Sequence, residues 1–116
     1  IVDVDIAGPG DVVLGDIDGM LDISIAGSGL VRAARMDGPM TVRIAGSGAV
    51  AVKAGRTDRL RAFIDGSGGI FFRGAVTQPE LTLYGSSEVR MNSLNGRMTR
   101  RGKGGAVYVN GVRREN

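Results

Sequence analysis

The chain of 116 residues is 42% apolar, enough for one packed domain, and carries a net charge of +3. It contains neither histidine nor cysteine, which excludes disulfides, thiolate metal sites and the commonest general base at neutral pH. Twenty glycines against three prolines, without a collagen triplet, indicate many tight corners. No apolar run is long enough for a membrane span, and no signal peptide is present. The sequence has no initiator Met and opens on the strand-like IVDVDI, so we expect a mature or excised segment.

The charge is unevenly distributed. Residues 1–50 hold seven Asp and three Arg, a net charge of −4, whereas residues 51–116 hold twelve Lys or Arg and five acids, a net charge of +7. Such polarity bears on association and partners rather than on fold. The C-terminal segment has no acid between residues 97 and 114, and it is either a solvated end or a candidate anion-binding basic end, formed by Arg97, Arg100, Arg101, Lys103, Arg113 and Arg114.

A nine-residue phrase recurs along the chain. It reads IAGSGLVRA at 25–33, IAGSGAVAV at 44–52 and IDGSGGIFF at 64–72. Small-residue corners begin at Gly8, Gly27, Gly46, Gly66 and Gly85, at intervals of 19, 19, 20 and 19 residues, and a degenerate sixth lies at 102–105. A constant period of this length predicts a repeat architecture.

Each repeat has the same internal pattern. An alternating stretch precedes the corner, as in Leu21, Ile23 and Ile25, and a second follows it, as in Val31 and Ala33. Period-two alternation predicts strands with one buried face. Beyond the second strand we expect a third buried column of apolar or small residues, namely Ile17, Met36, Gly55, Ala75, Leu94 and Val112.

Equivalent apolar residues can be buried only if successive copies stack, which makes their strands parallel. The inward spacings do not follow the hexad of left-handed β-helices, and parallel crossovers are right-handed by strong preference. We therefore predict an all-β fold, a single-stranded right-handed parallel β-helix of about six short rungs of 17–20 residues. Residues 1–116 would form a single repeat domain and a rod roughly 30 Å long, from six strand spacings. The alternative is a β-sandwich, which the strict period disfavours.

The repeated phrase IAGSGxVxV resembles the head GIN domain family of auto-transporter adhesins over residues 4–95. The resemblance implies a β-helical fold, an exported, periplasmic or cell-surface setting, and a binding or structural role without known catalysis. It transfers no catalytic residue. The last repeat departs from the family pattern, because RMTRRGKGG replaces the apolar strand before the corner. The family's domain is usually longer, so we expect this chain to be a fragment of a longer β-helix.

The Gly-Ser-Gly corners are interpreted as bends rather than phosphate-binding loops, because a strand and not a helix follows them. Their serines have no histidine that could act as a base. Asp16, Asp18 and Asp22 share a polar loop region and more often solvate a turn than bind a cation. We therefore predict no catalytic, cofactor or metal site. The acid pair Asp3 and Asp5 lies on a convex surface without the loop insertions that wall the clefts of polysaccharide-active β-helices.

The outward position between the two core residues of the second strand reads Val13, Arg32, Ala51, Phe71, Arg90 and Tyr108 through the repeats. Phe63 and Tyr84 also point outward by phase. Exposed aromatic and arginine side chains either stabilise a sheet as cross-strand ladders or contact a partner. The candidate partner surface comprises Phe63, Phe71, Tyr84, Arg90 and Tyr108.

The leading functional interpretation is a non-catalytic, adhesin-like binding or structural module of the cell envelope, with a glycan or protein partner. One alternative is a structural module that assembles end-to-end or edge-to-edge as a homo-oligomer, because open β-helix ends expose unpaired backbone. A polysaccharide-active enzyme is a second alternative, disfavoured by the missing cleft. Nucleic-acid binding is disfavoured because no recognised fold signature accompanies the basic end.

Overall fold

The computed structural model describes residues 2–102 and 104–114, with only the backbone for the last two of these. Within them the chain forms fourteen strands and no helix. Sheet A contains β1 (Val2–Ala7), β3 (Leu21–Gly27), β5 (Met40–Gly46), β8 (Leu60–Gly66), β10 (Pro79–Gly85) and β12 (Thr99–Arg101). Sheet B contains β2 (Asp11–Asp18), β4 (Leu30–Asp37), β6 (Ala49–Val52), β7 (Gly55–Thr57), β9 (Gly69–Thr77), β11 (Glu88–Asn95), β13 (Ala106–Val109) and β14 (Val112–Arg114).

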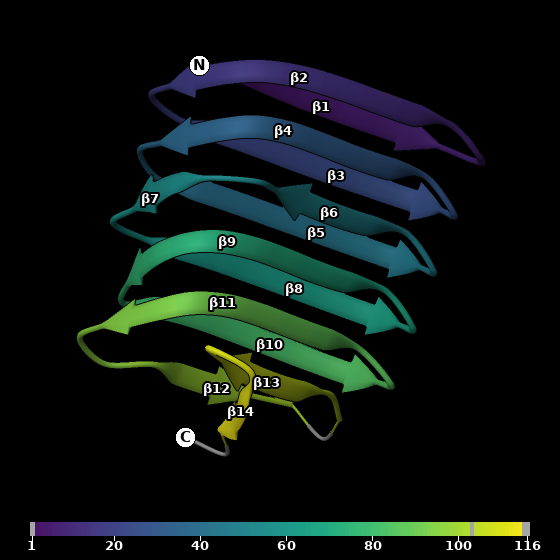
Figure 1. Ribbon diagram of the computed structural model, residues 1–116. Coiled ribbons are helices and arrows are strands. Elements are labelled where there is room, and N and C mark those ends of the chain that lie inside the picture. Colours follow the sequence, from purple (N-terminus) through teal and green to yellow (C-terminus); the bar gives the residue numbers. More distant parts are fainter. Residues whose placement is uncertain (1, 103, 115–116) are drawn as a thin grey trace.

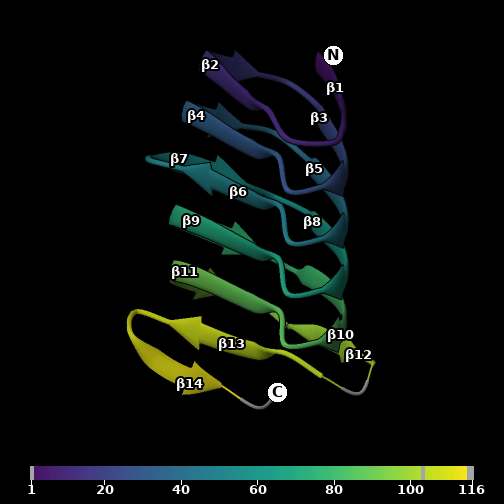
Figure 2. The ribbon, with the colours of Figure 1, turned by 90° about the vertical axis from the view of Figure 1, so that its right-hand side faces the viewer.

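The predicted β-helix is confirmed as a β-solenoid of about six turns. Each turn, called a coil below, contributes one strand to sheet A and then one to sheet B, and coils 1 to 6 follow the chain (Figure 1). Figure 2 shows the two sheets side by side, edge-on. In Figure 1 the chain runs left to right in the rear sheet A, returns right to left in the front sheet B, and descends with each turn, so the coil is right-handed.

The strands stack in register, one full coil apart. Ile6, Ile25, Ile44 and Ile64 are successive Cα partners in sheet A, and the ladder continues at Leu83. The molecule measures 31 × 30 × 20 Å. It is therefore a block rather than the expected rod, because strands of seven to nine residues are about as long as six strand spacings.

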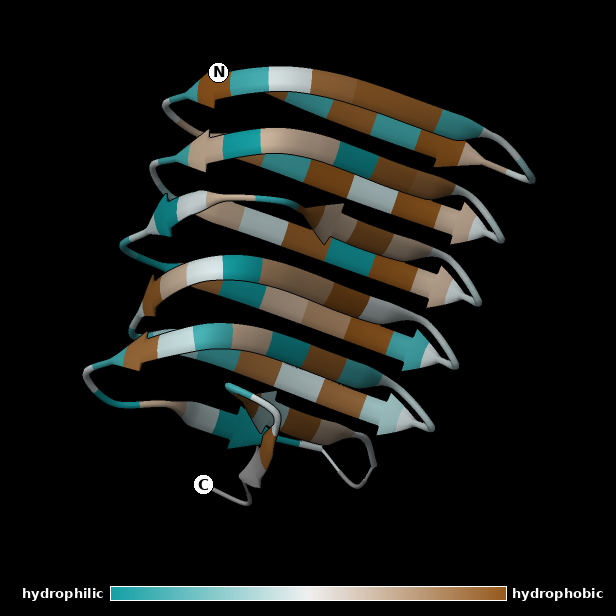
Figure 3. Cartoon of the chain, viewed as in Figure 1, coloured by the Kyte–Doolittle hydropathy of each residue, from teal (hydrophilic) through white to brown (hydrophobic). Residues whose placement is uncertain are grey.

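The core lies between the two sheets and contains the alternating residues that the sequence predicts. Leu21, Ile23 and Ile25 of β3 are at most 2% exposed, and they face the buried Val31 and Ala33 of β4. Figure 3 shows the alternation of apolar and polar residues along nearly every strand. Since every inward side chain repeats in the next coil, each interior column is a continuous apolar ladder.

The Gly-Ser-Gly segments are corners, as expected. Gly46 has φ of 117°, in the left-handed region that favours glycine. A Cβ there would lie 2.6 Å from the carbonyl oxygen of Gly27 in the preceding coil. The corner backbones therefore stack too closely for any side chain at this position.

The third buried column is wrong in coils 3 and 4. Thr57 (1% exposed) and Val76 (0%) are the buried residues there, rather than Gly55 and Ala75. In coil 4, the β9 strand bulges where it pairs with β11, and its extra residue shifts the register by one. In coil 3, Gly55 keeps its register with Met36, and the buried Thr57 lies two residues farther along β7. The Thr57 hydroxyl donates a hydrogen bond of 3.0 Å to the carbonyl of Arg59, which satisfies this polar group in the core.

The last coil also differs from the prediction. Val112 was expected in the buried column, but it is 62% exposed on β14, which pairs antiparallel with β13. The chain reverses at Asn110 and Gly111, whose φ angles are 52° and 78°. Two consecutive residues with positive φ make the tight hairpin turn that Asn-Gly favours. The chain therefore ends sheet B with a hairpin instead of a further parallel strand.

Candidate ligand-binding surface

The outer face of sheet B carries a groove of about 550 Å³ over coils 3 to 6. It contains two of the aromatic residues of the candidate partner surface together with several cationic side chains. Its lining residues are Ala51, Val52, Lys53, Phe71, Phe72, Arg73, Arg90, Met91, Asn92, Tyr108 and Gly111. We call it the sheet-B groove.

The outward column predicted from the sequence forms one ladder along this face. Arg32 pairs with Ala51, Ala51 with Phe71, Phe71 with Arg90 and Arg90 with Tyr108, each in the next coil. Neighbouring strands lie about 4.8 Å apart, so these side chains are nearest neighbours along the solenoid axis. The small side chain of Ala51 leaves the hollow in which Phe71 is exposed.

Arg90 holds the C-terminal end of the groove rigid. Its Nε donates to the Oε1 atom of Glu88 at 2.6 Å, and its Cζ lies 5.0 Å from the centroid of the Tyr108 ring. The ion pair with Glu88 offsets the charge of Arg90, and the cation–π contact covers one face of the Tyr108 ring. Arg90 and Tyr108 therefore act as a preformed wall.

Phe71 is the exposed aromatic side chain of the groove, 36% accessible to solvent. Its ring lies over Gly69, where a Cβ would be 3.4 Å from the ring Cζ atom. Because Gly69 has no side chain, the ring can lie along its own strand. Phe71 thus offers an exposed aromatic ring beside the cationic side chains of the groove.

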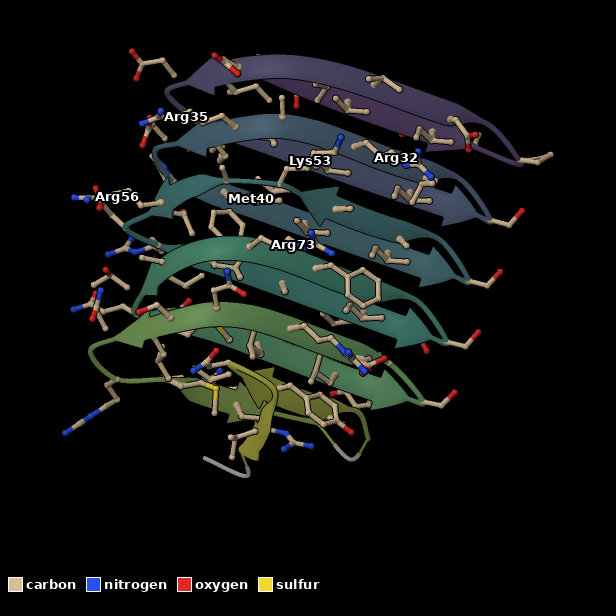
Figure 4. The ribbon with its side chains drawn as sticks, viewed as in Figure 1. Arg32, Arg35, Met40, Lys53, Arg56 and Arg73 are labelled. Carbon is tan, nitrogen blue, oxygen red and sulfur yellow. The ribbon has the colours of Figure 1, made fainter. Side chains whose placement is uncertain are left out.

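Sequence reasoning missed two cations of this site, Lys53 and Arg73. Each follows a core residue, Val52 or Phe72, and these are register partners, so both cations project outward beside the Phe71 column. Figure 4 shows Arg32, Lys53 and Arg73 projecting from three successive coils on this face. The alternation that placed Phe71 outward also places Lys53 and Arg73 outward, and that signal could have found them.

The other two aromatic residues of the candidate surface lie on the opposite face. Phe63 and Tyr84 project from sheet A, with ring centroids 5.9 Å apart at an interplanar angle of 57°. They are 45% and 41% exposed. A smaller groove of about 440 Å³ beside Phe63 includes Arg43, Arg61 and Glu80. The five predicted residues therefore form two separate surfaces, one on each sheet.

Only some residues of the candidate basic end are exposed to solvent. Arg97 and Arg101 are exposed. Arg100 instead occupies an inward column as the register partner of Leu81, and its Nη2 donates to the carbonyl oxygen of Gly105 at 2.6 Å. Its guanidinium thus binds backbone carbonyls at the end of the core. Lys103 and the side chains of Arg113 and Arg114 lie outside the described residues.

The N-terminal coils carry acidic side chains on both faces. Asp3 and Asp22 are register partners on sheet A and line a groove with Asp5, whereas Asp16 and Asp18 lie on sheet B. Within the described ranges, no three or more carboxylates are grouped so that they could hold a metal ion.

Among residues 2–102 and 104–114, no helix is long and apolar enough to cross a membrane. Comparison of the chain with family models, with curated proteins and with solved structures finds no match.

Proposed function

We propose that the chain is a non-catalytic binding module of the cell envelope, adhesin-like, which presents the outer face of sheet B to a glycan or protein partner. The observation that carries the proposal is the sheet-B groove, where exposed Phe71 lies between cations on a face without inserted loops. Sugar rings and aromatic side chains stack, and arginine and aromatic residues are enriched where proteins bind partners. The resemblance to the head GIN domain family supports the exported setting.

Rigidity is a second argument for a binding role. The groove residues project from β6, β9 and β11, whose inward neighbours Val52, Phe72 and Met91 are at most 2% exposed. Side chains on strands with a packed core lose little further freedom on binding. The face is thus preorganised for a partner, and no lid or closure is required.

The proposal predicts binding that depends on one face. Removing both rings with Phe71→Ala and Tyr108→Ala should weaken binding to an array of immobilised glycans and extracellular matrix proteins by about thirtyfold or more, since loss of even one hot-spot side chain costs about 2 kcal/mol. The matched control, Phe63→Ala with Tyr84→Ala, removes the same two residue types from sheet A and should leave binding unchanged. Equal losses in both variants, or no loss in the sheet-B variant, would contradict the proposal.

A second candidate function is self-assembly through the ends of the solenoid. Coil 1 is acidic, because residues 2–19 contain five Asp and no Lys or Arg. The sequence of coil 6 is basic, because no Asp or Glu occurs between residues 97 and 114, a range that contains Arg97, Arg100 and Arg101. Val2, Val4, Val12 and Leu14 of coil 1 are only partly buried against the core. Assembly through these ends would respond to salt and concentration, and the loss of the sheet-B rings would not affect it.

A further inference from the structure

We propose that the sheet-B groove and the adjoining surface of coil 2 bind a linear acidic polysaccharide whose chain lies along the solenoid axis, across coils 2 to 5. This inference rests on the proposed binding function and adds the chemical class of the ligand and its direction. Three features of the face carry it: unpaired cations at successive coils, one exposed aromatic ring beside them, and an acidic boundary at coil 1.

The cations lie on two adjacent outward columns of sheet B. Lys53 and Arg73 follow the register partners Val52 and Phe72 and are neighbours along the axis, whereas Arg32 belongs to the column of Ala51 and Phe71. Arg32, Lys53 and Arg73 project from β4, from the end of β6 and from β9, one from each of coils 2, 3 and 4 (Figure 4). Among the described residues, the ion pairs are Arg35–Asp37, Arg61–Glu80 and Arg90–Glu88, and none involves these three cations. Lys53 and Arg73 lie about one strand spacing apart, and with Arg32 in the adjacent column they put three uncompensated charges on one face, which matches a polymer with repeated anions.

The aromatic component of the groove suits a single sugar ring. Phe71 lies two residues before Arg73 on β9, and its register partners are Ala51 in coil 3 and Arg90 of the wall in coil 5. Its ring is exposed, whereas Arg90 covers one face of the Tyr108 ring. A pyranose ring can pack its C–H face on Phe71 while the carboxylates of the neighbouring residues reach Lys53 and Arg73.

The same geometry favours a polysaccharide over a single-stranded nucleic acid. Sequence-tolerant binding of single strands uses several aromatic side chains on which successive bases stack, and this groove offers one uncovered ring. A linked pyranose chain also advances by nearly one strand spacing per residue, whereas the phosphates of an extended nucleic acid lie farther apart. The step between successive coils is therefore closer to the repeat of an acidic glycan.

Coil 1 sets the limit of the path. Asp11 and Asp16 lie on β2, the first strand of sheet B, and Asp16 is the register partner of Arg35. An anionic chain that extended beyond coil 2 would meet these carboxylates and be repelled. The path therefore runs from coil 2 toward coil 5, where Glu88 is already paired with Arg90.

The experiment is a calorimetric titration of the full chain with polygalacturonate, alongside a neutral linear glucan and oligodeoxythymidine. We expect binding of polygalacturonate that weakens as salt rises, because salt screens exposed charges. Lys53→Gln with Arg73→Gln should lower the affinity by about tenfold. The matched control, Arg43→Gln with Arg61→Gln, removes two cations from the outer face of sheet A and should bind as the wild type does.

Each alternative outcome overturns the inference. It fails if polygalacturonate does not bind, if oligodeoxythymidine or the neutral glucan binds as tightly, or if both double variants lose affinity equally. Thermal melts of all variants ensure that lost binding is not lost folding. If array binding depends on Phe71 and Tyr108 but polygalacturonate does not bind, the ligand class is wrong and the binding function stands. If neither assay depends on sheet B, both proposals fail.

Discussion

At the Gly-Ser-Gly corners, the second glycine is required for a different reason from the first. A Cβ at Gly48 would lie 2.6 Å from the Cγ2 atom of Ile25 and 2.8 Å from the carbonyl oxygen of Gly29. The side chain of Ile25 thus already fills the space that a side chain at position 48 would occupy. Ser47 between the two glycines remains exposed. The repeated phrase therefore records how closely successive coils stack, and the serine is the position that stacking leaves unconstrained.

The inward and outward phase of each strand can be tested at two adjacent residues. Ile44 is 1% exposed in the middle of the core, whereas Arg43 points outward from the same strand. Ile44→Asp places an unpaired carboxylate in the apolar ladder and should lower the free energy of unfolding by about 3 kcal/mol or more. Chemical denaturation followed by circular dichroism measures the change.

Arg43→Asp is the matched control, since it introduces the same side chain one residue earlier. We expect a change within about 0.5 kcal/mol, as is usual for exposed positions. If both variants were tolerated, or both unfolded the protein, the assigned phase of β5 would be wrong.

Whole strands were predictable wherever the alternation was uninterrupted. The columns through Ile25 and Val31 and the outward column through Phe71 lie where the pattern placed them, because a period of two leaves one choice of face. The third column failed at Ala75, where Val76 is buried instead, because an extra residue in β9 can bulge outward without a mark in the apolar pattern.

The candidate site could be predicted less well than the strands. The pattern states which side chains point outward, but it does not state which sheet each strand joins. Phe63 and Phe71 therefore belong to one predicted surface, although a corner of the coil separates their strands and places them on different sheets. Lys53 and Arg73 lie in the outward column next to that of Phe71, and their closeness to each other becomes apparent only when the strands of coils 3 and 4 are aligned in register.

The terminal hairpin is the element whose sequence signal was present but not used. Asn110-Gly111 stands between Tyr108-Val109 and Val112, which is a typical hairpin sequence. The repeat pattern alone instead predicts that Val112 continues the buried column of a parallel coil. The consequence is physical: β14 covers the edge of β13 with an antiparallel strand of three residues. Short edge strands of this kind limit edge-to-edge pairing.

Disrupting the turn should expose that edge. Gly111 has φ of 78°, so Gly111→Val is expected to strain the turn and release β14, because β-branched residues rarely adopt positive φ. Trypsin should then cleave after Arg113 and Arg114 several-fold faster, as mass spectrometry of a time course would record. Gly15→Val is the matched control, since Gly15 lies in β2 and a Cβ there meets nothing within 4 Å. Similar cleavage rates in the two variants would contradict a structural role for the turn.

For the molecule as a whole, the two ends of the solenoid differ. At the C-terminal end, the β13–β14 hairpin and the Arg100 guanidinium cover the edge of sheet B and the end of the core. At the N-terminal end, β1 and β2 have no further strand beside them among the described residues, and the side chains of Val4 and Leu14 are only partly buried. The ends also differ in charge, because acids dominate coil 1 and cations dominate coil 6. Opposite charge at opposite ends favours a head-to-tail contact over a symmetric one.

Self-assembly through the ends therefore predicts a mass that depends on salt and on concentration. At low salt, light scattering coupled to size-exclusion chromatography should show mass increasing with concentration, and at high salt the chain should be monomeric, because screening removes the attraction between exposed charges. Asp11→Asn with Asp16→Asn should weaken association by removing charge from coil 1. Asp58→Asn with Asp65→Asn removes the same charge from the middle of the solenoid and should not. A strict monomer at both salt concentrations would exclude assembly through the ends, and the exposed edges of β1 and β2 would then be held apart by the mutual repulsion of their aspartates.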